Sequence, residues 1–127
     1  MWLKMKLSKN NLSDFFEYYH FFYDSYITNI NYLINDNKIE LYIDVCWSGK
    51  PILKENKIYE TNKTKLKLIF DEIKEFNCKE IFSWDYIDKA YIDNIKIDGK
   101  DYICFASNKE NSLIYIISDN IEINEIK

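Results

Sequence analysis

FFEYYHFFYDSY, residues 15–26, decides this fold, because it brings eight aromatic rings and the chain's only histidine, His20, into twelve positions. Rings at this density supply a large area for burial, so the segment belongs either in a packed core or on a binding surface. Apart from His20 it offers no nucleophile, metal ligand or strong base. The stretch therefore predicts architecture and does not by itself define a chemistry.

Length and composition predict a single domain over residues 1–127. A chain of this size buries roughly two thirds of its unfolded surface, and with one proline and two glycines no interior segment has the composition of a linker. Every basic residue is lysine, and isoleucine, asparagine and lysine fill 52 of the 127 positions, as in proteins encoded by A/T-rich genomes. Isoleucine therefore counts for less here as a strand signal.

The aromatic stretch is expected to begin in a helix and to end in a strand. Helical spacing predicts a short helix over residues 11–20, whose apolar face is formed by Leu12, Phe15, Phe16 and Tyr19. Alternation then predicts a strand over about residues 24–34. A turn at Asn35-Asp36-Asn37 and the alternating segment KIELYIDVCW, residues 38–47, complete an antiparallel hairpin. We expect the aromatic helix to cover the apolar face of this hairpin.

Residues 64–76, TKLKLIFDEIKEF, satisfy two patterns. Leu66, Leu68 and Phe70 alternate with lysines as in a strand, whereas helical spacing is also met and the composition suits a helix. We favour a strand with a bulge near Asp71 and Glu72. The preceding WSGKP, residues 47–51, lacks the spacing of a phosphate-binding loop and is interpreted as a turn.

The second half of the chain is expected to consist of strands. Residues 91–97 lead into Asp98-Gly99, a strong hairpin signal, and residues 102–106 return. After a polar loop at 107–112, LIYIIS is a continuous apolar strand that could be buried on both faces, and a separate last strand holds Ile121 and Ile123. The predicted fold class is α+β: a mainly antiparallel curved sheet or partly open barrel of six or seven strands, with one aromatic-rich N-terminal helix.

Several chemistries lack support in the sequence. The three cysteines, Cys46, Cys78 and Cys104, are widely spaced, so neither a disulfide framework nor a zinc site is indicated. A cysteine nucleophile would need His20 beside it, and this histidine is interpreted as structural. A catalytic carboxylate pair leaves no local signature, so the 21 acidic residues do not point to one. We therefore expect no catalytic residue, no metal and no cofactor.

Charge and hydropathy narrow the partners and the compartment. A net charge of −4 with dispersed lysines argues against nucleic-acid binding. The amino terminus, MWLKMKLSKN, interleaves charges with apolar residues, and no run reaches membrane-spanning length, so neither a signal peptide nor a membrane partner is expected. Free cysteines and these features together predict a cytoplasmic protein, and a homo-oligomer is compatible with the sequence.

The net negative charge lies in one quarter of the chain. Residues 71–101 contain nine acidic residues against five lysines, whereas the remainder carries twelve of each sign. Aromatic residues accompany these acids, a composition that suits a surface for a basic protein partner. The alternative is a solvated face with the rings in the core. The candidate partner-binding residues are Asp71, Glu72, Glu75, Glu80, Trp84, Asp85, Tyr86 and Asp88.

FYDSYITNI, residues 22–30, followed by a long alternating strand, resembles the opening of small bacterial proteins that include presumed immunity proteins of toxin systems and uncharacterised α+β domains. The resemblance covers about the first forty residues, although a histidine stands in some of those proteins where this chain has Tyr23. It implies a non-enzymatic protein that binds and neutralises a toxin domain. The alternative function is a small ligand-binding domain or enzyme with an aromatic-lined pocket.

Overall fold

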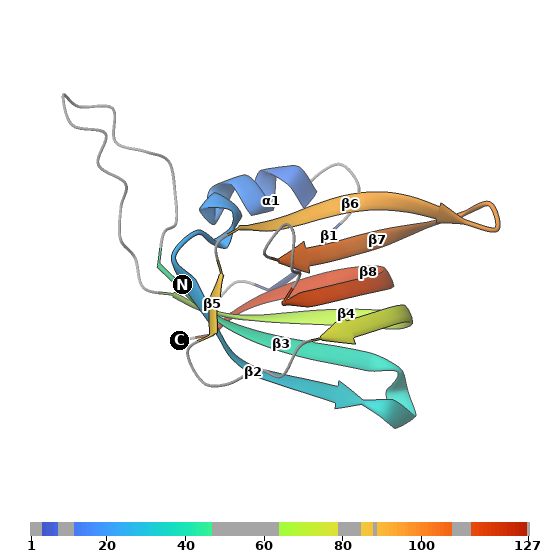
Figure 1. Ribbon diagram of the computed structural model, residues 1–127, viewed down its shortest axis with the longest axis horizontal. Coiled ribbons are helices and arrows are strands. Elements are labelled where there is room, and N and C mark those ends of the chain that lie inside the picture. The colour runs from blue at the N-terminus through green and yellow to red at the C-terminus, as the bar shows by residue number, and fades with distance from the viewer. Residues whose placement is uncertain are drawn as a thin grey trace.

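The computed structural model describes residues 4–7, 12–46, 64–78, 85–87, 89–107 and 113–126. These residues form one short α-helix, two 3-10 helices and eight strands (Figure 1). In chain order the elements are β1 (Lys4–Leu7), α1 (Leu12–Tyr18), η1 (His20–Phe22), β2 (Ser25–Leu33), η2 (Ile34–Asp36), β3 (Lys38–Val45), β4 (Thr64–Cys78), β5 (Asp85–Ile87), β6 (Ala90–Ile97), β7 (Lys100–Ser107) and β8 (Ile114–Ile126).

All eight described strands belong to one antiparallel sheet, seven of them in the order β5-β2-β3-β4-β8-β7-β6. The remaining strand, β1, pairs with the second half of β8, on the same side of β8 on which β7 pairs with the first half. Among the described pairings the terminal strands β5 and β6 are not joined to each other, so the sheet is open. Its curvature is visible in Figure 1. The predicted antiparallel sheet is confirmed, but helix is a minor part of the fold and the α+β assignment holds only in part.

The two longest strands, β4 and β8, bend together near their middles. Glu72 in β4 adopts a left-handed backbone with φ of 48°, and the register between the strands shifts between Ile73 and Glu75. The first half of β4 pairs with β3 on one side and with the second half of β8 on the other. The second half of β4 pairs with the first half of β8. The predicted strand is therefore confirmed and the helical alternative is wrong, and the bulge lies between Ile73 and Glu75, just after the predicted position near residues 71 and 72.

Aromatic rings of residues 16–22 pack in the core between the helix and the sheet. Phe16 of α1 packs against Phe22 at a centroid distance of 5.0 Å and against Phe105 of β7 at 5.8 Å. Between α1 and β2 the chain turns through left-handed residues, among them Phe22, which is completely buried. Burial of this ring offsets the strain of a non-glycine residue at positive φ. The main contacts of the aromatic helix are thus with η1, β6 and β7, in the other half of the sheet from the β2–β3 hairpin that it was expected to cover.

The β2–β3 and β6–β7 hairpins follow the sequence prediction. Residues Ile39, Leu41, Ile43 and Val45 are buried along one face of β3, and Asp98 and Gly99 form the second turn with φ of 50° and 81°. One expectation near the end of the chain needs correction, because the apolar segment and the predicted last strand form one continuous strand, β8. Its polar middle does not end it, since Asn120 pairs in register with Asp71. WSGKP at 47–51 and residues 108–112 lie outside the described residues.

The described helices are short, and no helix in this part of the chain has the length and apolar character needed to span a membrane. The described cysteines form no disulfide; Cys104 is buried, and Cys46 and Cys78 are half-buried.

Candidate functional site

The tip of the β2–β3 hairpin exposes a continuous apolar segment. Tyr32, Leu33 and Ile34 are 44%, 38% and 78% exposed, and each is large enough to gain substantially from burial. The strand ends here because η2 turns the chain back and Asn37 completes the turn in a left-handed conformation that asparagine tolerates. We refer to residues 32–37 as the hairpin tip.

Asn37 ties the hairpin tip to the second half of β4. Its side-chain amide donates a hydrogen bond to the carbonyl oxygen of Ile73 at 3.1 Å, while its own backbone carbonyl oxygen accepts one from the Ile73 amide at 3.4 Å. The hydroxyl of Tyr32 donates to the Asn37 side-chain oxygen at 3.3 Å, and its ring meets Phe76 edge-on at 5.7 Å. The exposed apolar segment is thus held in place beside β4.

Acidic side chains surround the bend of β4 next to this tip. The carboxyl groups of Glu72 and Asp119 share a hydrogen bond, and this contact with a neighbouring acid raises the pKa of Glu72 above its ordinary value. Lys100 lies 3.1 Å from Asp119 and partly compensates the pair. Two carboxyl groups in contact repel each other when both are ionised, which is the physical cause of the raised pKa of Glu72.

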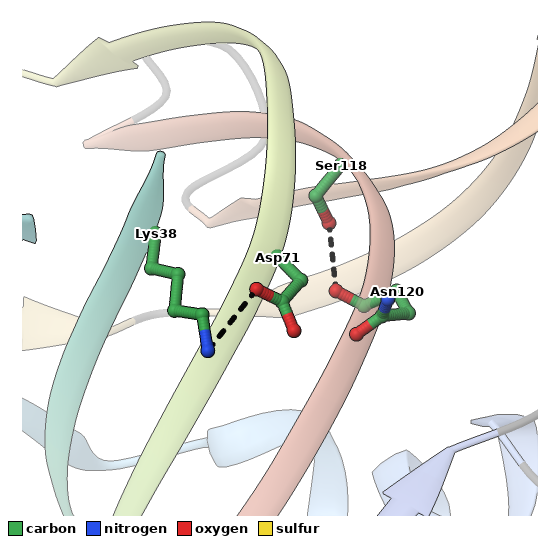
Figure 2. Close-up of polar contacts among 4 residues, drawn as sticks. All are labelled: Lys38, Asp71, Ser118 and Asn120. Carbon is green, nitrogen blue, oxygen red and sulfur yellow. Dashed lines mark hydrogen bonds and ion pairs between the residues drawn. The ribbon is translucent and has the colours of Figure 1, made fainter. Parts of the chain in front are cut away.

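Figure 2 shows one polar contact at the bend of each of the two strands, β4 and β8. Lys38, the first residue of β3, reaches Asp71 of β4 at 3.5 Å. On β8, the Ser118 hydroxyl donates to the backbone carbonyl oxygen of Asn120 at 3.2 Å, which satisfies a polar group within the bend. The ion pair is partly exposed, so it contributes little to stability by itself. The ion pair nevertheless orients the carboxylate of Asp71.

The described charges around the tip and the bend are predominantly negative. We refer to this group as the acidic bend, and it comprises Asp36, Asp71, Glu72, Glu75 and Asp119. The lysines nearest in the chain or in contact are Lys38, Lys74 and Lys100, so five carboxylates face three ammonium groups, a balance of −2. The apolar tip therefore lies next to an acidic surface.

The structure separates the residues that the sequence prediction had grouped together. Asp71, Glu72 and Glu75 lie on β4 beside the tip, whereas β5, which holds Asp85 and Tyr86, pairs with the start of β2 at the far edge of the sheet. Two strands, β2 and β3, intervene between β4 and β5. Glu80, Trp84 and Asp88 lie outside the described residues.

Sequence reasoning missed part of this surface. The partner of Glu72 is Asp119, 47 positions further along the chain, and only the long-range pairing of β4 with β8 brings the two together. The tip residues Leu33 and Ile34 were available as a signal, since they are apolar residues immediately before a polar turn. The strand predicted over residues 24–34 ends on these two residues, and alternation alone does not show that they lie on an exposed tip.

The remaining candidate groups do not assemble a reactive centre within the described residues. His20 lies half-buried in η1 and has a partner in the structure. No group of three or more histidine, cysteine or acidic side chains is arranged to hold a metal ion in the described segments. Comparison of the chain with protein-family models, with curated proteins and with solved structures finds no match.

Proposed function

We propose that this protein is a non-enzymatic binding domain that uses the hairpin tip and the acidic bend to hold a basic protein partner. The observation that carries the proposal is the position of Ile34, a large apolar side chain that is 78% exposed beside a group of carboxylates. An isolated exposed apolar residue is ordinary, but three in succession on a fixed turn suit an anchor for a partner.

The carboxylates supply the second half of the recognition. A negative balance around an apolar centre attracts a positively charged surface during the encounter and disfavours acidic proteins. The tip enters such a contact at low cost in conformational entropy, because Asn37 already fixes it to β4 through two hydrogen bonds.

Within this class, we favour an immunity protein that neutralises a bacterial toxin by covering a basic surface of the toxin. The opening of the chain, FYDSYITNI followed by a long alternating strand, resembles that of presumed immunity proteins. Toxins that act on nucleic acids need basic surfaces, and an acidic domain can cover such a surface without catalysis or cofactor.

The alternative of an aromatic-lined ligand pocket gains no support from the rings in the core. Phe16 packs on Phe22 and Phe105, and Phe105 also lies 5.3 Å from Phe70 between ring centroids. These rings contact one another and fill the core between the helix and the sheet, so their role is packing.

Affinity capture with matched variants tests the proposal. The wild-type protein is used as bait beside Leu33→Ser/Ile34→Ser at the tip and Tyr23→Ser, a control at an exposed aromatic residue after η1. Loss of the two anchors is expected to weaken binding by about 2 kcal/mol, or roughly 30-fold, whereas the control retains the partner. Equal recovery of the partner by all three baits would show that the tip is not the binding surface.

A growth assay separates immunity from other kinds of protein binding. The captured partner is expressed alone and then together with the wild-type protein, the tip variant or the Tyr23→Ser control. An immunity function requires that the partner arrests growth alone and that only the wild-type protein and the Tyr23 control restore it. If the partner does not affect growth, it is not a toxin, and the protein is a binding domain with a function other than immunity.

A further inference from the structure

A second surface of the molecule combines tyrosines with carboxylates on the outer side of the β4–β8–β7–β6 half of the sheet. Directly opposed residues of antiparallel strands share a face. The register places Glu75 opposite Ile117, Ile117 opposite Cys104, and Cys104 opposite Asp93. The neighbouring row contains Tyr115 and Tyr91, both opposite Ala106 of β7. We refer to this surface, centred on Glu75, Tyr91, Asp93, Tyr115 and Ile117, as the tyrosine face.

The tyrosine face points away from the core. Along the strands its residues alternate with Phe105 and Ile116, which belong to the buried core cluster. Phe105 contacts Phe16 of α1, so the core lies on the opposite side of the sheet from the tyrosine face. Cys104 and Ile117 are only 5% and 2% exposed although neither is a member of that cluster. The hydroxyl of Tyr115 is hydrogen-bonded to the Cys104 sulfur, so the tyrosine covers the thiol. The ring of Tyr115 thus lies on the outside of the smaller, buried side chains of this face.

Elsewhere the same molecule pairs tyrosines and carboxylates with a lysine. Lys67 lies 5.7 Å from the centre of the Tyr42 ring and 2.7 Å from the Glu40 carboxylate. Lys100 lies 5.3 Å from the Tyr102 ring and 3.1 Å from Asp119. In both places an ammonium group sits over a tyrosine ring and pairs with a carboxylate, a combination that cation–π attraction and charge pairing favour together.

Among the described residues, the tyrosine face has the ring and the carboxylates of this arrangement but no lysine in the position of the cation. Glu75 approaches from β4 and Asp93 from β6, and both act electrostatically on Cys104 between them. Glu75 and Tyr91 also act on Tyr115. In the part of the chain that the structure describes, none of the lysines forms an ion pair with either carboxylate or lies over Tyr91 or Tyr115.

We propose that the tyrosine face docks a basic protein partner by receiving an arginine or lysine side chain over Tyr91 and Tyr115, between the carboxylates of Glu75 and Asp93. The inference rests on the proposed function, which it deepens by naming the chemistry of the partner's contact. Arginine fits best, because its planar guanidinium stacks on aromatic rings and donates to carboxylates on either side. Glu75 belongs to the acidic bend as well, so the tyrosine face continues the surface proposed for the partner.

A peptide titration tests this inference without knowledge of the partner. The probe is a blocked hexapeptide with two arginines, and its control is the same peptide with citrulline, which keeps the shape of arginine and lacks the charge. Binding is followed through the NMR signals of the tyrosine rings of the intact protein. We expect the arginine peptide to shift the Tyr91 and Tyr115 signals and to bind at least tenfold more tightly than the citrulline peptide.

Variants assign the binding to the face. The double variant Glu75→Gln/Asp93→Asn is expected to bind the arginine peptide at least fivefold more weakly. The control Asp14→Asn/Glu17→Gln, at exposed positions of α1, is expected to bind it with unchanged affinity. Equal affinity for both peptides, shifts confined to other tyrosines, an unaffected double variant or absence of binding would each overturn the inference. If the arginine peptide does not bind while capture of a partner still depends on Leu33 and Ile34, the proposed function stands and only the docking role of the tyrosine face is withdrawn.

Discussion

The side-chain amide of Asn37 lies 3.1 Å from the carbonyl oxygen of Ile73 and donates a hydrogen bond to it, across 36 positions of sequence. This contact joins the tip of one hairpin to the strand that carries the acidic bend. The apolar anchors and the carboxylates therefore keep one arrangement relative to each other, which a binding surface requires.

Replacing Asn37 with glycine shows how much the hydrogen bonds of its side chain contribute to the free energy of unfolding. Glycine accepts the left-handed backbone of position 37, where φ is 50°, but removes the hydrogen bonds of the amide group. We expect the free energy of unfolding to fall by about 1 kcal/mol, the usual net worth of such a bond. Asn37→Ala is expected to cost roughly 1 kcal/mol more, because it adds backbone strain. Urea unfolding measures both, and a glycine variant as stable as wild type would contradict the role of these hydrogen bonds.

The acid pair at the bend predicts a pH dependence of stability. The neighbouring Asp119 raises the folded-state pKa of Glu72 above 4.5, so folding favours its protonated form. This contribution is fully present below the unfolded pKa and is lost as the pH rises through the folded pKa. Glu72→Gln is therefore expected to raise the melting temperature at pH 7, with a gain that shrinks towards pH 4. The control Glu17→Gln is expected to show no such trend, and a gain from Glu72→Gln that does not change with pH would refute the coupling.

The β6–β7 turn depends on the backbone of Gly99. Its φ is 81°, and a Cβ atom placed there would meet nothing within 4 Å, so conformational strain alone decides the effect of a substitution. We expect Gly99→Ala to lower the free energy of unfolding by about 1–2 kcal/mol. Gly99→Asn is expected to cost less, because asparagine tolerates the left-handed region. Thermal unfolding of the two variants checks the order, and equal stabilities would argue against it.

Phe105 connects the helix to the sheet, because its ring contacts Phe16 of α1 and Phe70 of β4. Phe105→Ala is expected to destabilise the protein by about 3–5 kcal/mol through lost burial and the cavity that remains. Tyr23→Ala, at a 41% exposed position, is expected to stay within about 0.5 kcal/mol of wild type. Denaturant unfolding distinguishes them, and a loss below about 1 kcal/mol for Phe105→Ala would mean that the core does not depend on this ring.

Much of the sheet could be predicted from local patterns. The two hairpins were accessible because strict alternation ends at Asn35-Asp36-Asn37 and at Asp98-Gly99, which are turn sequences with a known backbone preference. The approximate position of the bulge was also accessible, since the apolar alternation stops near Asp71 and Glu72. Two short strands were not predicted: β1 has four residues and β5 three, too few for a period to emerge.

The candidate surfaces depend on pairings that local patterns do not contain. Glu72 meets Asp119, and Glu75 lies in one row with Asp93, only because β4, β8, β7 and β6 adopt their particular registers. The clustering of acids in residues 71–101 singled out Glu72 and Glu75, but the acid that contacts Glu72 is Asp119, which lies outside that segment. The clustering could not show that β5 lies at the opposite edge of the sheet, because strand order is a property of the whole chain.

Hydrogen exchange of the protein, free and bound to its captured partner, tests the central claim most directly. The account predicts that binding slows exchange of backbone amides in residues 32–38 and 71–76, because the hairpin tip and the acidic bend become covered. The start of β2 beside β5, residues 25–27, is expected to exchange as it does in the free protein. Protection confined to residues 25–27 and 85–87, with residues 32–38 and 71–76 unchanged, would contradict the claim.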